Sequence, residues 1–274
     1  MTLIDFMKKL KPQLPLPVIR GLEFVYYRIY LKGLCLYLDA VEKGDCARKG
    51  VPTASLRYRV NGRPELVGFL AQGEACCIDL QNALAGIGKR VDSLGEVLDF
   101  GCGCGRTLRW FDSFSGASRF SGTDIDAEAI GFCRTALPGM HFSVNGALPP
   151  LPYPDGQFDL IYSISVLTHL DEEYQFRWLE ELQRIAAPGG IVLLSLHGRH
   201  CWSNLPAELF ARIESDGFLF SAENVWKGIF PEWYQTAFHT ETYVRNCFSR
   251  YFQVLDYLPR GISDFQDLVV LKKR

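Results

Sequence analysis

The 274-residue sequence lacks runs of basic residues, and its 29 Lys and Arg residues are offset by 31 Asp and Glu residues to a net charge of −2. A chain without a basic patch has no electrostatic footprint for nucleic acid, so we expect no nucleic-acid partner. The sequence also lacks a CxxC pair, although it contains nine cysteines spread along the chain. This odd, scattered set argues against a disulfide framework and predicts reduced thiols in a cytoplasmic protein.

The N-terminal region lacks the features of a secretion signal or a membrane span. Its first residues, MTLIDFMKKLKPQLPLP, show no basic start followed by an apolar run and a cleavage site. Residues 21–40 are largely apolar, but charges such as Arg28, Lys32 and Asp39 interrupt them, and a span needs ~20 predominantly apolar residues. We expect a helix packed on the main domain and no stable membrane insertion. An interfacial membrane helix and a homodimer contact are the alternatives.

The pattern of predicted secondary structure changes near residue 93. Residues 1–92 are expected to form a helical cap or lid, with a loop around 49–65 and a helix over 65–84. From residue 96, short apolar runs alternate with helical segments, which predicts a parallel sheet covered on both faces. Residues 93–274 therefore form the expected main domain, with an aromatic insertion at about 200–240.

Seven short segments have the apolar character of strands. They are residues 96–100, 119–126, 140–146, 158–166, 189–198, 252–258 and 267–273. A helix over residues 106–114 is expected after the first strand, and a Pro-Arg-Gly turn at residues 259–261 is expected between the last two.

The stretch EVLDFGCGCGRTLRW, residues 96–110, places three glycines directly after an apolar strand. In an open α/β sheet, ligands bind beyond the carboxyl ends of the strands, and glycines let the backbone approach them closely. The dinucleotide fingerprint G-x-G-x-x-G is absent, because Arg106 takes its third glycine position. The pattern present is D-x-G-x-G-x-G from Asp99, and Asp124 ends the next strand, where a ribose diol would be held.

Four motifs in order resemble the class I S-adenosylmethionine-dependent methyltransferases, over roughly residues 95–274. LDFGCGCG resembles the family's glycine loop, GTDID its ribose-binding strand end, LPYPDGQFDLIYSISVLTHL its fourth-strand unit and LQRIAAPGGIVLLSL its fifth-strand unit. The resemblance implies an α/β Rossmann-like fold, whose seven-stranded sheet ends in an antiparallel hairpin, and S-adenosylmethionine as the cofactor. The implied cofactor-binding residues are Asp99, Gly101, Cys102, Gly103, Gly105, Asp124, Ile125, Ser163 and Ser165.

The chain departs from the family pattern after the third strand. Many relatives have Gly-Asp-Ala there, and the Asp accepts a hydrogen bond from the adenine amino group, whereas this chain has Asn-Gly-Ala-Leu. We expect the side-chain amide of Asn145 to take over this role, with the backbone of Gly146 and Ala147 on the ring nitrogens.

A metal site is not expected. Cys102 and Cys104 are one residue apart, and no second Cys or His pair follows at metal-ligand spacing, so we interpret them as small residues in a tight loop.

Catalytic groups are hard to identify from the sequence, which shows no triad and no carboxylate pair. Methyl transfer from a sulfonium is an in-line displacement that depends mainly on positioning, and it needs a base only if the acceptor must lose a proton. The candidate residues are His169, His239 and Tyr174, and His197 lies on the same side of the sheet. Each of them also has a structural interpretation, such as capping or core packing. Arg57 and Arg59 are candidates to bind a carboxylate of the cofactor or the substrate.

The resemblance implies transfer of a methyl group to a small-molecule acceptor, for which the aromatic insertion supplies a pocket. Two alternatives stay open. A cyclase similar to the azetidine-2-carboxylate synthases would consume S-adenosylmethionine and release methylthioadenosine, if the lid left no room for an acceptor. A non-catalytic subunit would bind the cofactor without turning it over.

Overall fold

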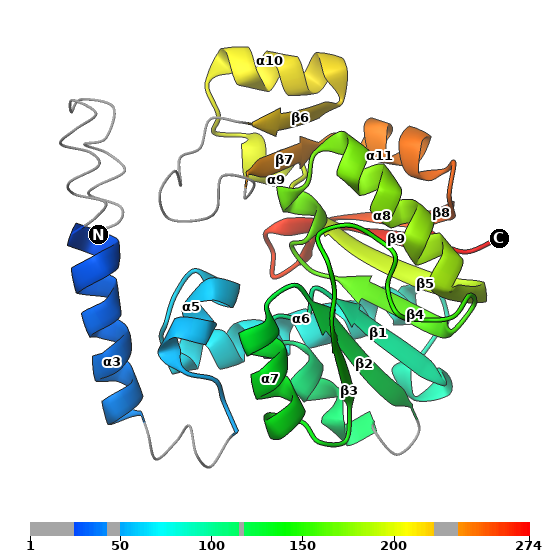
Figure 1. Cartoon of the computed structure of the whole chain (residues 1–274). Coiled ribbons are helices and arrows are strands. Elements are labelled where there is room, and N and C mark those ends of the chain that lie inside the picture. The colour runs from blue at the N-terminus through cyan, green and yellow to red at the C-terminus, as the bar shows by residue number, and fades with distance from the viewer. Residues whose placement is uncertain (1–24, 43–49, 115–117, 222–234) are drawn as a thin grey trace.

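A seven-stranded sheet forms the centre of the computed structural model, which describes residues 25–42, 50–114, 118–221 and 235–274 (Figure 1). The strand order is β3-β2-β1-β4-β5-β9-β8. The strands are β1 (Glu96–Phe100), β2 (Arg119–Asp124), β3 (His141–Val144), β4 (Phe158–Ser163), β5 (Ala186–Leu196), β8 (Gln253–Ile262) and β9 (Gln266–Lys272). Strands β1 to β5 are parallel, and β9 is antiparallel to both β5 and β8. The predicted Rossmann-like sheet with an antiparallel end is confirmed.

Both faces of the sheet are apolar because each is covered by helices. The helices are α6 (Leu66–Gly86), α7 (Ala127–Ala136), α8 (Glu172–Ile185) and α11 (Glu241–Phe248). Leu98 and Ile161 point to the face packed against α8 and α11. Their neighbours Val97 and Leu160 point to the opposite face, which α6 covers. This alternation explains why the strands read as continuous apolar runs in the sequence.

The N-terminal segment differs from the expectation in two respects. Residues predicted as a loop contain the helix α5 (Ala54–Asn61), because Thr53 accepts a hydrogen bond from the Leu56 amide at its start and Gly62 ends it at φ +68°. Helix α6, assigned to the cap, shares a hydrophobic core with the sheet. The preceding elements are a π-helix, η2 (Val25–Leu31), and α3 (Lys32–Val41), which packs on α5.

The aromatic insertion forms a small unit with its own core. Its elements are α9 (Arg199–Trp202), α10 (Ala207–Asp216), β6 (Phe218–Ser221) and β7 (Thr236–His239), and β6 pairs with β7 in antiparallel fashion. Trp202, Ile213 and Leu219 pack together inside it. Four aromatic residues of the insertion, which was expected to supply a pocket, lie outside the described residues: Trp226, Phe230, Trp233 and Tyr234.

Two local predictions were wrong. The helix expected over residues 106–114 is a 3-10 helix, η4 (Leu108–Phe114). The Pro-Arg-Gly residues 259–261, expected to form a turn, are part of β8. The chain reverses after the end of this strand, at Ser263 and Asp264, which both have positive φ. Two further 3-10 turns, η3 (Val91–Ser93) and η5 (Leu167–His169), precede β1 and α8.

Candidate functional site

The glycine turn follows β1 at the carboxyl edge of the sheet, where the strand order reverses between β1 and β4. Gly101 and Gly103 have φ values of +82° and +52°. A Cβ at Gly101 would lie 2.1 Å from Cγ2 of Val166, and one at Gly103 would lie 2.6 Å from Cγ2 of Val60. Only glycine fits both positions, because the left-handed backbone and the packed valines exclude a side chain.

Asp124 lies against this turn from the end of β2. Its Oδ2 accepts a hydrogen bond from the Gly103 amide at 2.7 Å, and its Oδ1 accepts one from the Asp126 amide at 2.8 Å. Burial raises the pKa of this carboxyl, and the two backbone donors oppose the rise. The next side chain, Ile125, is 46% exposed. The sheet therefore brings together the carboxylate, the glycine turn and an accessible apolar side chain.

Asp99 is a second acidic group at this edge, and its side chain is buried in β1. Burial raises the pKa of Asp99 to about 7, the Asp124 charge adds to the rise, and Tyr162 and Arg106 oppose it. Burial thus favours the protonated form of this carboxyl at a higher pH than for an exposed aspartate. A cation bound beside it would favour the carboxylate form.

The residues after β3 are the ones expected to contact the adenine ring of the cofactor. The backbone amide of Asn145 donates to the Asp124 carbonyl at 3.0 Å, which holds this segment beside Asp124. The Asn145 side chain already has partners, because its Oδ1 accepts from Thr123 and its Nδ2 donates to the Gly146 carbonyl at 2.7 Å. Gly146 and Ala147 are exposed. The backbone of these two residues is thus accessible at this edge, whereas the side-chain amide of Asn145 already has protein partners.

The cysteines of the glycine turn are buried. The Cys102 and Cys104 thiols point into the protein, and burial raises the pKa of Cys104 to about 12 and that of Cys102 well above its ordinary value. A metal ligand would have to be a thiolate, which these surroundings disfavour. In the parts of the chain that the structure describes, no three His, Cys, Asp or Glu side chains form a group that could hold a metal ion.

A polar cluster lies where β4 ends, next to the amino end of β9. Ser163 is buried, and Ser165 has φ +64°, an unusual value for a residue other than glycine. The Ser165 amide donates to Oγ of Ser195 at 2.8 Å, and its own Oγ lies 2.9 Å from Nε2 of Gln266. Sequence reasoning missed Gln266, because β9 runs antiparallel and its first residues, not its last, share this edge.

Two histidines extend the cluster. The rings of His169 and His197 are 6.2 Å apart and nearly perpendicular, and Nε2 of His197 lies 3.4 Å from Nε2 of Gln266. Nδ1 of His169 lies 2.8 Å from the Gln235 carbonyl. Burial lowers the pKa of each histidine to about 4, so both are neutral at pH 7. The structure thus brings His169 and His197 together at the carboxyl edge.

Of the other two catalytic candidates, His239 is next to His197, because its backbone amide donates to the His197 carbonyl at 3.0 Å, and Tyr174 is on α8. His239 is completely buried in β7, its Nε2 lies 3.0 Å from Oε1 of Gln175, and burial lowers its pKa to about 3. Tyr174 is on the first turn of α8, where its amide donates to Asp171 and its side chain is partly exposed. Neither has a contact with the glycine turn or Ser165 among the described interactions, and we infer structural roles for both.

The two arginine candidates are engaged within the protein. Arg57 is completely buried, donates to the carbonyls of Pro52 and Pro64, and forms an ion pair with Glu42. Arg59 pairs with Asp126 and Glu128 on α7. The hypothesis that Arg57 meets a ligand carboxylate is therefore wrong, because its guanidinium supports the fold of the N-terminal helices.

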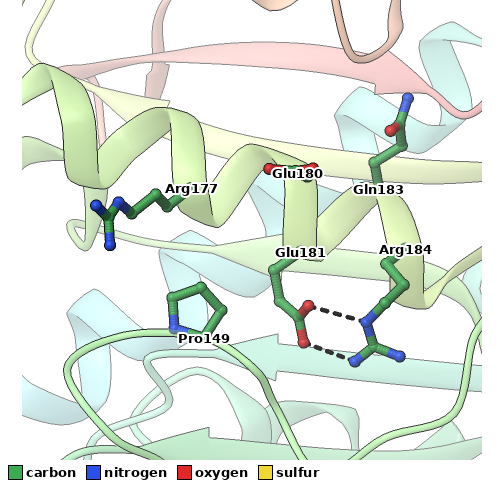
Figure 2. A pocket seen from close by; sticks show the side chains of 6 residues that line it. All are labelled: Pro149, Arg177, Glu180, Glu181, Gln183 and Arg184. Atoms are coloured by element: carbon green, nitrogen blue, oxygen red, sulfur yellow. Dashed lines mark hydrogen bonds and ion pairs between the residues drawn. The ribbon is translucent and has the colours of Figure 1, made fainter.

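A hollow of about 620 Å³ lies on the outer side of α8 (Figure 2). Figure 2 shows the Glu181–Arg184 ion pair on its wall, with Pro149 facing the helix. Its lining residues are Pro149, Arg177, Glu180, Glu181, Gln183 and Arg184. None of these belongs to the glycine turn or the polar cluster, so the hollow is separate from the candidate site.

Fold and site together define an α/β protein with a ligand site at the carboxyl edge of a doubly wound sheet. Residues 97–190 match the family described as "Methyltransferase domain". This segment, about a third of the chain, carries the similarity to S-adenosylmethionine-dependent methyltransferases.

Individual relatives show the same similarity over a similar length. The chain is 34% identical over 104 residues to tocopherol O-methyltransferase of Arabidopsis thaliana, which covers 36% of this chain and 29% of that protein. It is 32% identical over 112 residues to ajmaline N-methyltransferase of Rauvolfia serpentina. This match covers 37% of this chain and 36% of that protein. The matches therefore span about a third of these relatives. A Burkholderia thailandensis 1,6-didemethyltoxoflavin-N1-methyltransferase, solved with bound S-adenosylhomocysteine, has the same fold, with a TM-score of 0.52 at 17% identity over 73% of this chain and 79% of that one.

Proposed function

We propose that this protein transfers the methyl group of S-adenosylmethionine to a small-molecule acceptor by in-line displacement. The observation that carries the proposal is the Asp124 carboxylate hydrogen-bonded to the Gly103 amide at the carboxyl edge, inside the segment that matches the methyltransferase family. This is the position at which a doubly wound sheet holds a nucleoside.

The residues of this edge fit S-adenosylmethionine, which supplies the activated methyl group. The carboxylate of Asp124 offers acceptors to the two ribose hydroxyls. Ile125 offers an exposed apolar surface to the adenine ring. The buried Asp99, with its raised pKa, complements the positive charge of the cofactor, because a nearby cation favours the ionised carboxylate.

The polar cluster fits the acceptor side of the site. His169 and His197 are neutral at pH 7, so they can accept a hydrogen bond from an O–H or N–H of the acceptor and orient it. Phe238 and Phe265 pack beside His197 in tilted and edge-on orientations, with ring centroids at 5.8 and 6.4 Å from that of the imidazole. We infer an acceptor with an apolar ring and a hydroxyl or amine group, and a positioning role for the two histidines.

The proposal is tested by measuring binding and products. Isothermal titration calorimetry with S-adenosylhomocysteine and with NAD separates the two cofactor classes, and we expect binding of the first alone. Mass spectrometry then follows the fate of S-adenosylmethionine with and without acceptors that carry a ring hydroxyl or a ring amine. S-adenosylhomocysteine that forms only with an acceptor supports methyl transfer.

Two results would contradict this function. Enzyme-dependent methylthioadenosine without an acceptor would indicate the cyclase. Tight cofactor binding with no turnover across the acceptor panel would favour the non-catalytic subunit.

No helix among the described residues is long and apolar enough to cross a membrane. A cytoplasmic location and a homodimer remain predictions.

A further inference from the structure

The outward face of η2 and α3 is apolar and exposed. Five large side chains on it are between 51% and 64% exposed: Val25, Ile29, Leu36, Tyr37 and Val41. The opposite face is occupied, because Leu31 and Cys35 are buried against Ala54 of α5. This stretch is therefore apolar on both sides, and no described residue covers the apolar side chains of its outer face. In Figure 1, α3 stands at the edge of the molecule, away from the sheet.

The acidic groups of this segment are turned inward. Asp39 accepts a hydrogen bond from the Ala54 amide at 2.7 Å, and Glu42 pairs with the buried Arg57. Both carboxylates thus serve the junction with α5. Among the side chains described between residues 25 and 41, the exposed charged one is Lys32. The exposed side of this stretch therefore combines five apolar side chains with one described positive charge, that of Lys32.

The sequence of the N-terminal segment has an excess of basic residues. Residues 1–33 contain six Lys or Arg and two Asp or Glu residues, whereas the whole chain has a net charge of −2. The N-terminal segment is therefore positive and the remainder of the chain is negative. This asymmetry favours a negatively charged partner surface. It disfavours a second copy, whose equivalent segment would bring the same charge.

We propose that the outer face of η2 and α3 docks on the surface of an anionic lipid membrane. The apolar side chains enter the region between headgroups and acyl chains, and Lys32 contacts the headgroups. The proposed contact is with the membrane surface, and no helix among the described residues is long and apolar enough to span a membrane. This inference does not depend on the proposed methyl transfer, since none of these residues belongs to the cofactor or acceptor site.

The test is cosedimentation of the full chain with vesicles of phosphatidylcholine alone or mixed with phosphatidylserine. We expect binding to the mixed vesicles that weakens as salt rises. Leu36→Glu should lower the vesicle partition coefficient about tenfold or more, because it replaces an inserted apolar group with a charge. Lys32→Glu should weaken binding to mixed vesicles and leave the weak binding to neutral vesicles unchanged. Ile78→Glu, at another half-exposed apolar position on α6, is the matched control.

Folding of each variant is checked by circular dichroism, and oligomeric state by light scattering. Equal vesicle binding of Leu36→Glu, Ile78→Glu and the wild type would overturn the proposal, as would the absence of binding to mixed vesicles. A wild-type dimer that Leu36→Glu dissociates, without vesicle binding, would assign the face to a second copy. S-adenosylhomocysteine binding, measured in parallel, tests the proposed function separately, because Leu36→Glu should not change it.

Discussion

Asp99 should give the protein a pH-dependent stability that one substitution removes. Burial in β1 raises its pKa to about 7 from an ordinary value of 3.8. Between these two pH values the unfolded chain has lost the proton and the native protein has kept it. The native state therefore binds more protons, and its free energy of unfolding falls as the pH rises through this window. The contribution is fully present below about pH 4 and is lost above about pH 7.

The size of the effect follows from the shift. A rise from 3.8 to about 7 corresponds to at most about 4 kcal/mol, at 1.36 kcal/mol for each pKa unit. The Asp99→Asn variant has no titrating group at this position. Relative to the wild type, its free energy of unfolding should therefore increase by up to this amount between acidic and alkaline pH.

The assay is urea unfolding of the cofactor-free proteins at about pH 4.5 and pH 8, followed by tryptophan fluorescence. The quantity of interest is the variant-minus-wild-type difference, because other groups titrate in both proteins. Asp264→Asn is the control, since that carboxylate is 81% exposed at the β8–β9 turn. A difference for Asp99→Asn that stays the same at both pH values would refute the reasoning.

Three further predictions concern the site. Asp124→Ala should weaken S-adenosylhomocysteine binding by about 1–3 kcal/mol in calorimetry, and an unchanged affinity would place the ribose elsewhere. Gly101→Ala should lower the melting temperature, because its Cβ would lie 2.1 Å from Cγ2 of Val166. Adding Val166→Ala should recover part of the loss, and no recovery would argue against this clash. Because burial lowers the pKa of His197 to about 4, the rate should not follow a histidine titration between about pH 6 and pH 8. A wild-type step near about pH 6.5 that disappears in His197→Ala would contradict this.

The sequence alone determined the sheet, the glycine turn and Asp124. Apolar runs with interposed helical segments predict strands β1 to β5 because side-chain periodicity is a local property. The turn was readable because only glycine adopts the backbone of Gly101 and Gly103 beside packed valines. The acid at the end of β2 is readable because strand ends in a parallel sheet meet at one edge.

The remaining features depend on packing between segments that are far apart in the sequence. Gln266 reaches Ser165 because β9 is antiparallel, which reverses the end of the strand that meets the site. Arg57 was expected at a ligand, but Glu42 and two carbonyls surround it, since α5 lies where a loop was expected. His169 and His197 share an edge, whereas His239 lies in the core, because packing between distant segments sets burial, and burial sets the pKa. Contacts between residues far apart in the chain leave no periodic signal in the sequence, so these features could not be predicted from it.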